Sequence, residues 1–174
     1  MNKSQNINLL FAGDFIPPEN KNNIYSDELK SILNDKNFSV LNLETPLTER
    51  GKEIIKTGKN FRRPPSAVKH IKEGYFDAVC LSNNHIRDYG DQGVLDTIET
   101  CNQNNIQIVG AGNNIEVARK PLRIEIKGKK IAILNYSEKE FNTADENKAG
   151  ANPYDNINAF YDIQKEKQEN DYVI

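Results

Sequence analysis

The chain has 174 residues, of which 37% are hydrophobic and 28% are charged, and its formal net charge at pH 7 is −2. This length is typical of one domain with a sizeable core. The near-neutral balance gives no global electrostatic reason to expect nucleic acid or an anionic membrane as a partner, and no apolar run approaches the ~20 residues that span a bilayer.

The N-terminus and the cysteines both favour a cytoplasmic location for the chain as given. Residues 1–6 lead directly into a short apolar run and lack the long apolar segment of a signal peptide. Cys80 and Cys101 lie in apolar contexts, which favours buried reduced thiols over a disulfide or a metal pair. A membrane-associated, longer parent protein stays open.

Apolar periodicity predicts alternating strands and helices along the chain. The expected strands are residues 7–12, 38–43, 76–81 and 106–109. The expected helices are residues 26–33, 66–73, 90–104 and 115–119. A hairpin of residues 122–126 and 130–136 turns at Gly128, and a helix at 156–168 precedes a strand that begins at Asp171. Residues 47–63 and 137–152 have no clear period and are predicted as loops.

This order predicts an α/β fold with right-handed crossovers. Because a domain rarely ends four residues into a strand, we expect the chain to be one domain that is incomplete at its C-terminus.

Polar side chains that can bind a cation lie at the ends of the first three predicted strands. If these strands are parallel neighbours, the side chains converge at one carboxyl edge, where α/β proteins form ligand sites. Carboxylate, amide and imidazole ligands suit Mn²⁺, Mg²⁺, Zn²⁺ or iron. Local turn capping explains any one of these residues equally well. They are Asp14, Asn42, Glu44, Asn83, Asn84 and His85.

Four segments together resemble the CapA-type capsule-synthesis proteins. They are Gly13-Asp14, Asn42-Leu43-Glu44-Thr45-Pro46, the loop 81–90 with Asn83-Asn84-His85 and Asp88-Tyr89-Gly90, and Gly110-Ala111-Gly112-Asn113. This family serves poly-γ-glutamate capsules and is related to the calcineurin-like metallophosphoesterases. The resemblance implies a calcineurin-like αββα sandwich.

The resemblance also implies a role for each matching residue. Asp14, Glu44 and Asn84 match metal ligands, and His85 matches the general acid for the leaving group. Asp88 would orient the other ring nitrogen of His85.

Two departures from the phosphoesterase pattern reduce the expected metal site. The first phosphoesterase motif, Asp-x-His, reads Asp14-Phe15-Ile16 here. The downstream histidines would lie beyond Ile174. We therefore expect little catalysis from this chain alone, and we expect His70, which lies in a predicted helix among lysines, to be a solvated surface residue.

A basic loop precedes the second predicted helix. It either contacts an anionic polymer or a phosphate, with Arg62 and Arg63 as the substrate-binding candidates, or is an ordinary solvated loop. Its cations are Lys52, Lys56, Lys59, Arg62 and Arg63. Gly110-Ala111-Gly112 either presents backbone amides to an anion or forms a tight turn.

Three functions stay open at this point. The first is a metal-dependent hydrolase or transferase in the synthesis or export of a capsule polymer, either poly-γ-glutamate or polysaccharide, with other capsule-synthesis proteins as partners. The second is a non-catalytic polymer-binding or assembly protein on the same fold. The third is a phosphoesterase that acts on a small phosphate ester.

Overall fold

The computed structural model describes residues 6–174, so the first five residues discussed above lie outside the described part of the chain. Its largest sheet is parallel, with the strands in the order β1 (Leu9–Phe15), β2 (Phe38–Leu43), β3 (Ala78–Cys80) and β4 (Gln107–Val109). A second sheet joins the antiparallel pair β6 (Leu122–Ile126) and β7 (Lys129–Ile133) to β9 (Tyr172–Val173), which is parallel to β7. Two short strands, β5 (Ala111–Gly112) and β8 (Gly150–Ala151), form a separate pair.

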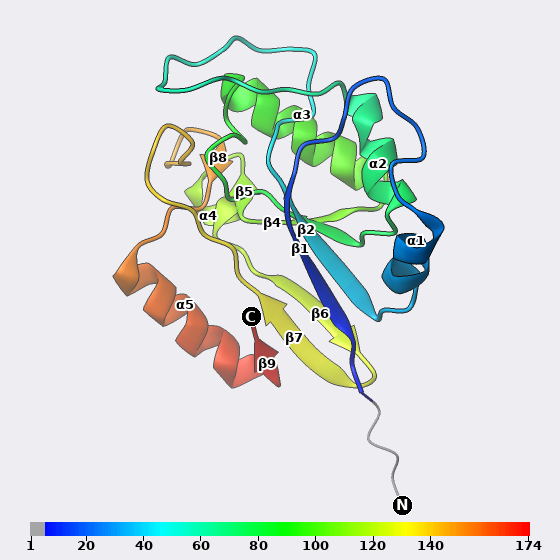
Figure 1. The fold of residues 1–174 in the computed structure, drawn as a ribbon. Helices are drawn as coiled ribbons and strands as arrows, with labels where there is room; N and C mark the ends of the chain where they lie inside the picture. Colours follow the sequence, from blue (N-terminus) through cyan, green and yellow to red (C-terminus); the bar gives the residue numbers. More distant parts are fainter. Residues whose placement is uncertain (1–5) are drawn as a thin grey trace, which may run out of the picture.

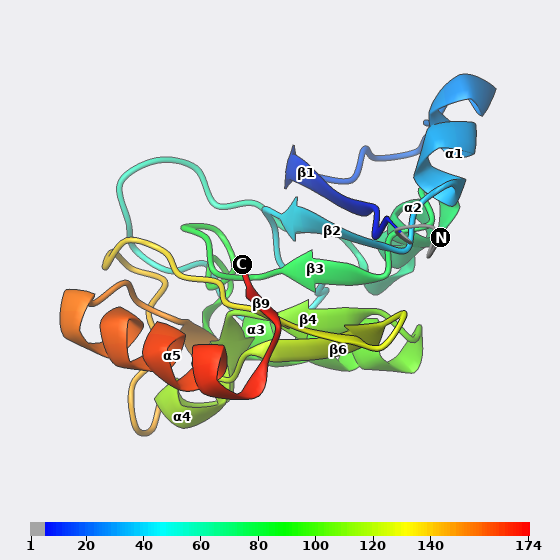
Figure 2. The same ribbon diagram turned by 90° about the horizontal axis from the view of Figure 1, so that it is seen from below.

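The helices and sheets form four layers (Figures 1 and 2). Helices α1 (Asp27–Asn34), α2 (Val68–Glu73) and α3 (Gly90–Gln103) pack against one face of the parallel sheet, and the second sheet packs against the other. Helix α5 (Asn156–Glu169) covers the outer side of the second sheet. The 3-10 helix η1 (Pro65–Ala67) leads into α2, and α4 (Ile115–Ala118) follows β5. This arrangement is an α/β sandwich: the order of elements predicts the α/β class, and the family resemblance implies the sandwich.

Alternating side chains of β2 explain why the sheet is buried on both faces. Leu41 and Leu43 pack among the helices, whereas Phe38 and Val40 pack against the second sheet. Successive side chains of a strand point to opposite faces. The apolar residues of β2 therefore contribute to both core clusters, and the polar residues of the strand are Ser39 and, near its carboxyl end, Asn42.

Most predicted elements are confirmed within a few residues, including the hairpin at Gly128. Two differ from the prediction. β1 continues through Gly13 to Phe15 because pairing with β2 resumes after a register shift at Ala12, so Asp14 lies inside the strand and not beyond its end. The segment 137–152 was expected to be structureless, but it contains β8 and several isolated bridges.

Helix α5 attaches to the sandwich through ion pairs as well as apolar contacts. Three of its large apolar residues, Ile157, Phe160 and Tyr161, are exposed. The buried side carries Ala159 and Glu166, and both carboxylate oxygens of Glu166 accept hydrogen bonds from the Arg123 guanidinium, at 2.6 and 2.7 Å. A bidentate pair of this kind fixes the orientation of the helix.

Removing the Glu166 carboxylate should therefore destabilise the protein. The Glu166 side chain is only 3% exposed, so we expect Glu166→Ala to lower the free energy of unfolding by about 1–3 kcal/mol, measured by urea denaturation. Glu169→Ala is the matched control, because Glu169 lies on the same helix, 4.0 Å from the same arginine, but is largely exposed. It should cost less than about 1 kcal/mol. Equal losses in the two variants would show that the buried pair is not what anchors α5.

Both cysteines are free thiols, as expected. Burial raises the pKa of Cys80 to about 11 and the pKa of Cys101 to about 12, so both stay protonated at neutral pH. Within residues 6–174, no helix combines the length and the apolar character that a membrane crossing requires.

Candidate functional site

The carboxyl edge of the parallel sheet brings side chains from β1, β2 and the loop after β3 into one hydrogen-bonded row. The Asn42 amide donates to Asp14 Oδ1 at 2.6 Å, and the Asn83 amide donates to Asn42 Oδ1 at 3.1 Å. Asn83 Oδ1 in turn accepts from the His85 backbone N–H at 3.1 Å. The three segments therefore converge, and the two buried or half-buried amides fix their spacing.

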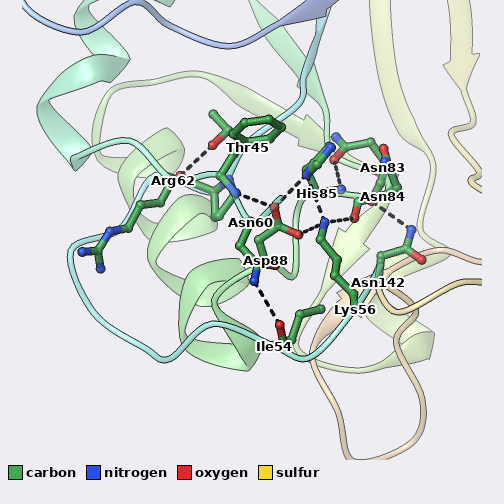
Figure 3. A network of polar contacts seen from close by, with 12 residues as sticks. Thr45, Ile54, Lys56, Asn60, Arg62, Asn83, Asn84, His85, Asp88 and Asn142 are labelled. Carbon is green, nitrogen blue, oxygen red and sulfur yellow. Dashed lines mark hydrogen bonds and ion pairs between the residues drawn. The ribbon is translucent and has the colours of Figure 1, made fainter. Parts of the chain in front are cut away.

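Asp88 is the centre of the polar contacts around His85 (Figure 3). Its side chain is fully buried. Oδ2 lies 2.7 Å from His85 Nδ1 and accepts the Phe61 backbone N–H at 2.7 Å, while Oδ1 pairs with the Lys56 ammonium. Asp88 thus holds the ring orientation of His85 and compensates a buried cation at the same time.

Lys56 comes from the basic loop, yet its side chain is only 4% exposed. Besides pairing with Asp88, its Nζ lies 3.1 Å from His85 Nδ1 and donates to the Asn84 carbonyl at 3.3 Å. Figure 3 shows the ammonium between the histidine ring and the aspartate. Of the two alternatives for the basic loop, the ordinary solvated loop therefore does not hold for Lys56.

The loop reaches this position because α3 anchors it (Figure 1). Thr48 and Arg50 both bond to Asp96 on α3. Burial alone would raise the pKa of Asp96, but these hydrogen bonds hold the pKa below its usual value. Further along, Gly51 has a φ of +82°, and a side chain there would meet the Tyr89 carbonyl at 2.3 Å. Glycine therefore lets the loop run back along α3 to the site.

Asp14 and Glu44 supply negative charge beside this cluster. Burial raises the pKa of the Glu44 carboxyl above its usual value, and the charges of Asp14 and Asp88 raise it further, while those of His85 and Lys56 lower it. Two carboxylates that repel one another in this way suit a bound cation, which would relieve the repulsion. Among residues 6–174, however, no group of three or more His, Cys, Asp or Glu side chains is placed to hold a metal ion.

His85 leaves its second ring nitrogen available for chemistry. The ring is packed against Phe61, with a centroid distance of 4.6 Å, and Nδ1 faces Asp88 and Lys56. No residue of the described chain hydrogen-bonds Nε2. A histidine held in one orientation with a free nitrogen has the geometry of a proton donor or acceptor. Asn84 is exposed on the same loop and is free to contact a ligand.

Other residues singled out in the sequence lie away from this cluster. Arg62 stacks over the Tyr89 ring at 4.6 Å and points away from His85 (Figure 3). Arg63 Nε donates to the Pro17 carbonyl at 2.6 Å. His70 was expected to be solvated, but only 1% of it is exposed because α2 turns it inward.

The Gly110–Gly112 segment bends at Gly110 and then continues as the strand β5. Gly110 has a φ of +90°, and the space beside it is filled by the Asn135 side chain. The Gly110 carbonyl accepts from Ser82 Oγ at 2.8 Å. The anion-binding alternative for this segment is therefore not favoured.

Comparison with known proteins identifies the family. The profile of the bacterial capsule synthesis protein PGA_cap matches residues 8–174. The chain belongs to the PGA_cap family. Two relatives support the assignment: the capsule biosynthesis protein CapA of Bacillus anthracis, 33% identical over 100 residues, and the PGA biosynthesis protein CapA of Bacillus subtilis, 33% identical over 105 residues. Each alignment covers 56% of this chain.

A third relative is a probable polyglutamine synthesis accessory protein of Mycobacterium tuberculosis, 32% identical over 87 residues and 50% of this chain. The aligned parts span only 24%, 26% and 23% of the lengths of these three relatives. This PGA_cap chain therefore matches about a quarter of each protein.

Sequence reasoning missed the roles of two residues in the PGA_cap site. Lys56 was grouped with exposed cations, and no local pattern distinguishes it from Lys52 or Lys59. Asn83 precedes the proposed ligand Asn84 in the sequence, but Asn83 is the buried one of the two. Its amide donates to Asn42 Oδ1 and to the Leu43 carbonyl, which connects the His85 loop to β2. No pattern in the sequence distinguishes Asn83 from the adjacent Asn84.

Proposed function

We propose that this PGA_cap chain provides part of a metal-dependent hydrolase or transferase site that acts in the synthesis or export of an anionic capsule polymer, poly-γ-glutamate in particular. The observation that supports it is the His85 ring, whose Nδ1 is held by the Asp88 carboxylate beside the Asp14 and Glu44 carboxylates. The names of the capsule-synthesis relatives support the polymer.

Each residue has a stated part in this proposal. Asp14, Glu44 and Asn84 would hold a divalent cation; Mn²⁺, Zn²⁺, Mg²⁺ and iron all suit such ligands. The bound cation would activate water and screen the charge of an anionic substrate. His85 would transfer a proton through Nε2 to the leaving group, and Asp88 would keep the proton on Nδ1.

A non-catalytic polymer-binding or assembly protein is the second candidate. Its support is that Phe15 and Ile16 follow Asp14, where the phosphoesterase motif has a histidine, and that residues 6–174 hold no group of three metal-binding His, Cys, Asp or Glu side chains. A phosphoesterase acting on a small ester is the third candidate, and it would use the same residues as the hydrolase.

Metal binding separates the first candidate from the second. At a concentration of 100 times the dissociation constant, Mn²⁺ would stabilise the protein by about 2.7 kcal/mol, which corresponds to a rise in Tm of roughly 5–10 °C for a chain of this size. We expect Glu44→Gln to abolish this rise in thermal unfolding experiments. The metal-free variant should be no less stable than the parent, because the raised pKa of Glu44 means that the fold disfavours its charge at neutral pH.

Asn84→Ala should reduce the same Mn²⁺-dependent rise in Tm. Asn102→Ala is its matched control, since Asn102 is an exposed asparagine at the far end of α3. A parent chain without any Mn²⁺ response, or a Glu44→Gln variant with the full response, would contradict the metal site and leave the assembly role.

A further inference from the structure

A cavity of about 300 Å³ lies between two segments that lead away from the candidate site. One wall is Pro18–Asn20, which follows β1 and therefore Asp14. The other wall runs from Arg63 to His70. The Arg63 backbone N–H bonds to the Pro46 carbonyl at 3.0 Å, two residues after Glu44. The two walls of the cavity are thus connected to β1, which carries Asp14, and to the segment after β2, which carries Glu44.

The lining of this cavity presents cations and an unpartnered imidazole. Lys69 lies on the rim, where its Nζ is 2.9 Å from Asn22 Oδ1. His70 lines the cavity with a side chain that is 1% exposed, and its Nδ1 has no hydrogen-bond partner; the nearest acid is Glu73 Oε2, 3.5 Å away. A buried polar atom without a partner is costly unless a ligand or water satisfies it.

Arg63 is held in place by the backbone. Its Nε donates to the Pro17 carbonyl at 2.6 Å, and Nη1 donates to the Arg62 carbonyl at 2.8 Å. The remaining partner of Nη1 is the Glu19 carboxylate at 3.2 Å, whose side chain is 67% exposed. The guanidinium is therefore fixed while its carboxylate partner is loosely held, because an exposed ion pair contributes little to stability.

We propose that this cavity binds a carboxylate of an acidic polymer, and that Glu19 occupies the Arg63 guanidinium when the polymer is absent. Arginine and a carboxylate match in geometry, and Glu19 is the same chemical group as a glutamate unit. The two segments that line the cavity follow β1 and β2, so a polymer bound at the carboxyl edge of the sheet would continue towards it. The inference rests on the proposed function only for the identity of the polymer.

Binding of a short γ-linked glutamate oligomer, measured by calorimetry in the presence of EDTA, tests this proposal apart from the metal site. Removing the competing carboxylate with Glu19→Gln should tighten binding by roughly 2–5-fold. A gain of affinity cannot result from damage to the fold. Glu49→Gln is the control, because Glu49 is an exposed glutamate of the neighbouring loop, and it should leave the affinity unchanged.

Loss of binding is the complementary expectation. Arg63→Gln should weaken binding of the oligomer by 10-fold or more, with circular dichroism as the check that the chain stays folded. The proposal is overturned if Glu19→Gln binds the oligomer no more tightly than the parent. It is also overturned if the oligomer does not bind in EDTA or if inorganic phosphate alone binds. None of these results bears on the Mn²⁺ experiment, so the two proposals fail independently.

Discussion

Asp88→Ala is expected to lower the free energy of unfolding by about 3–5 kcal/mol, because it removes one partner of a buried ion pair. Lys56 would keep its ammonium in a site that is almost closed to water. The Phe61 backbone N–H and His85 Nδ1 would also lose their acceptor. Urea denaturation, followed by circular dichroism, measures this loss.

Two further variants show whether the uncompensated Lys56 is the cause. Adding Lys56→Met to Asp88→Ala removes the buried charge, so the double variant should be more stable than Asp88→Ala alone. Asp91→Ala is a matched control: Asp91 is another paired aspartate at the same end of α3, but it is 44% exposed. It should cost less than about 1 kcal/mol. If Asp88→Ala cost no more than Asp91→Ala, the cluster would not be the anchor of the loop.

The same cluster shows where sequence patterns succeed. The family resemblance implied that Asp88, three residues after His85 in the same loop, would orient the His85 ring, and the two side chains do meet. Similarly, Phe38–Leu43 alternates along a strand that is buried on both faces, and its bounds were predicted as observed. Contacts and periodicity within a single segment can be predicted from the sequence because they do not depend on distant parts of the chain.

Lys56 and His70 show why other features could not be predicted. Lys56 is buried because bonds from Thr48 and Arg50 to α3 direct the loop, and those partners are 46 to 48 residues apart in sequence. Helix α2 packs against the core through Val68 and Ile71. His70 lies on the same side of the helix and is therefore buried with them. In each case a contact between distant segments decides the burial of a residue that is polar by type.

The strand β1 illustrates the same limit at the candidate metal site. Gly13 and Asp14 are typical of a turn, and the sequence predicted that the strand ends there. Pairing of Asp14 with Asn42 extends the strand instead. The carboxylate is consequently fixed to the sheet by a side-chain hydrogen bond from the neighbouring strand, which no pattern within residues 7–16 indicates.

On the proposed hydrolase function, His85→Ala is expected to lower the rate of metal-dependent hydrolysis by about 10²–10⁴-fold, the usual contribution of a positioned proton donor, from a parent rate that we expect to be low. The rate would be measured with an aryl phosphate and, separately, with a γ-glutamyl anilide in the presence of Mn²⁺. Whichever substrate the parent chain hydrolyses identifies the reaction class.

The Mn²⁺-dependent rise in Tm distinguishes the two roles open to this histidine. If His85 transfers a proton, His85→Ala should lose activity and keep the full rise in Tm, because Asp14, Glu44 and Asn84 remain. If activity and the rise in Tm disappear together, His85 is a metal ligand and the proton comes from another group. Full activity in His85→Ala would contradict both roles. In that case the contacts from Asp88 and Lys56 would serve only to close the loop over the sheet edge.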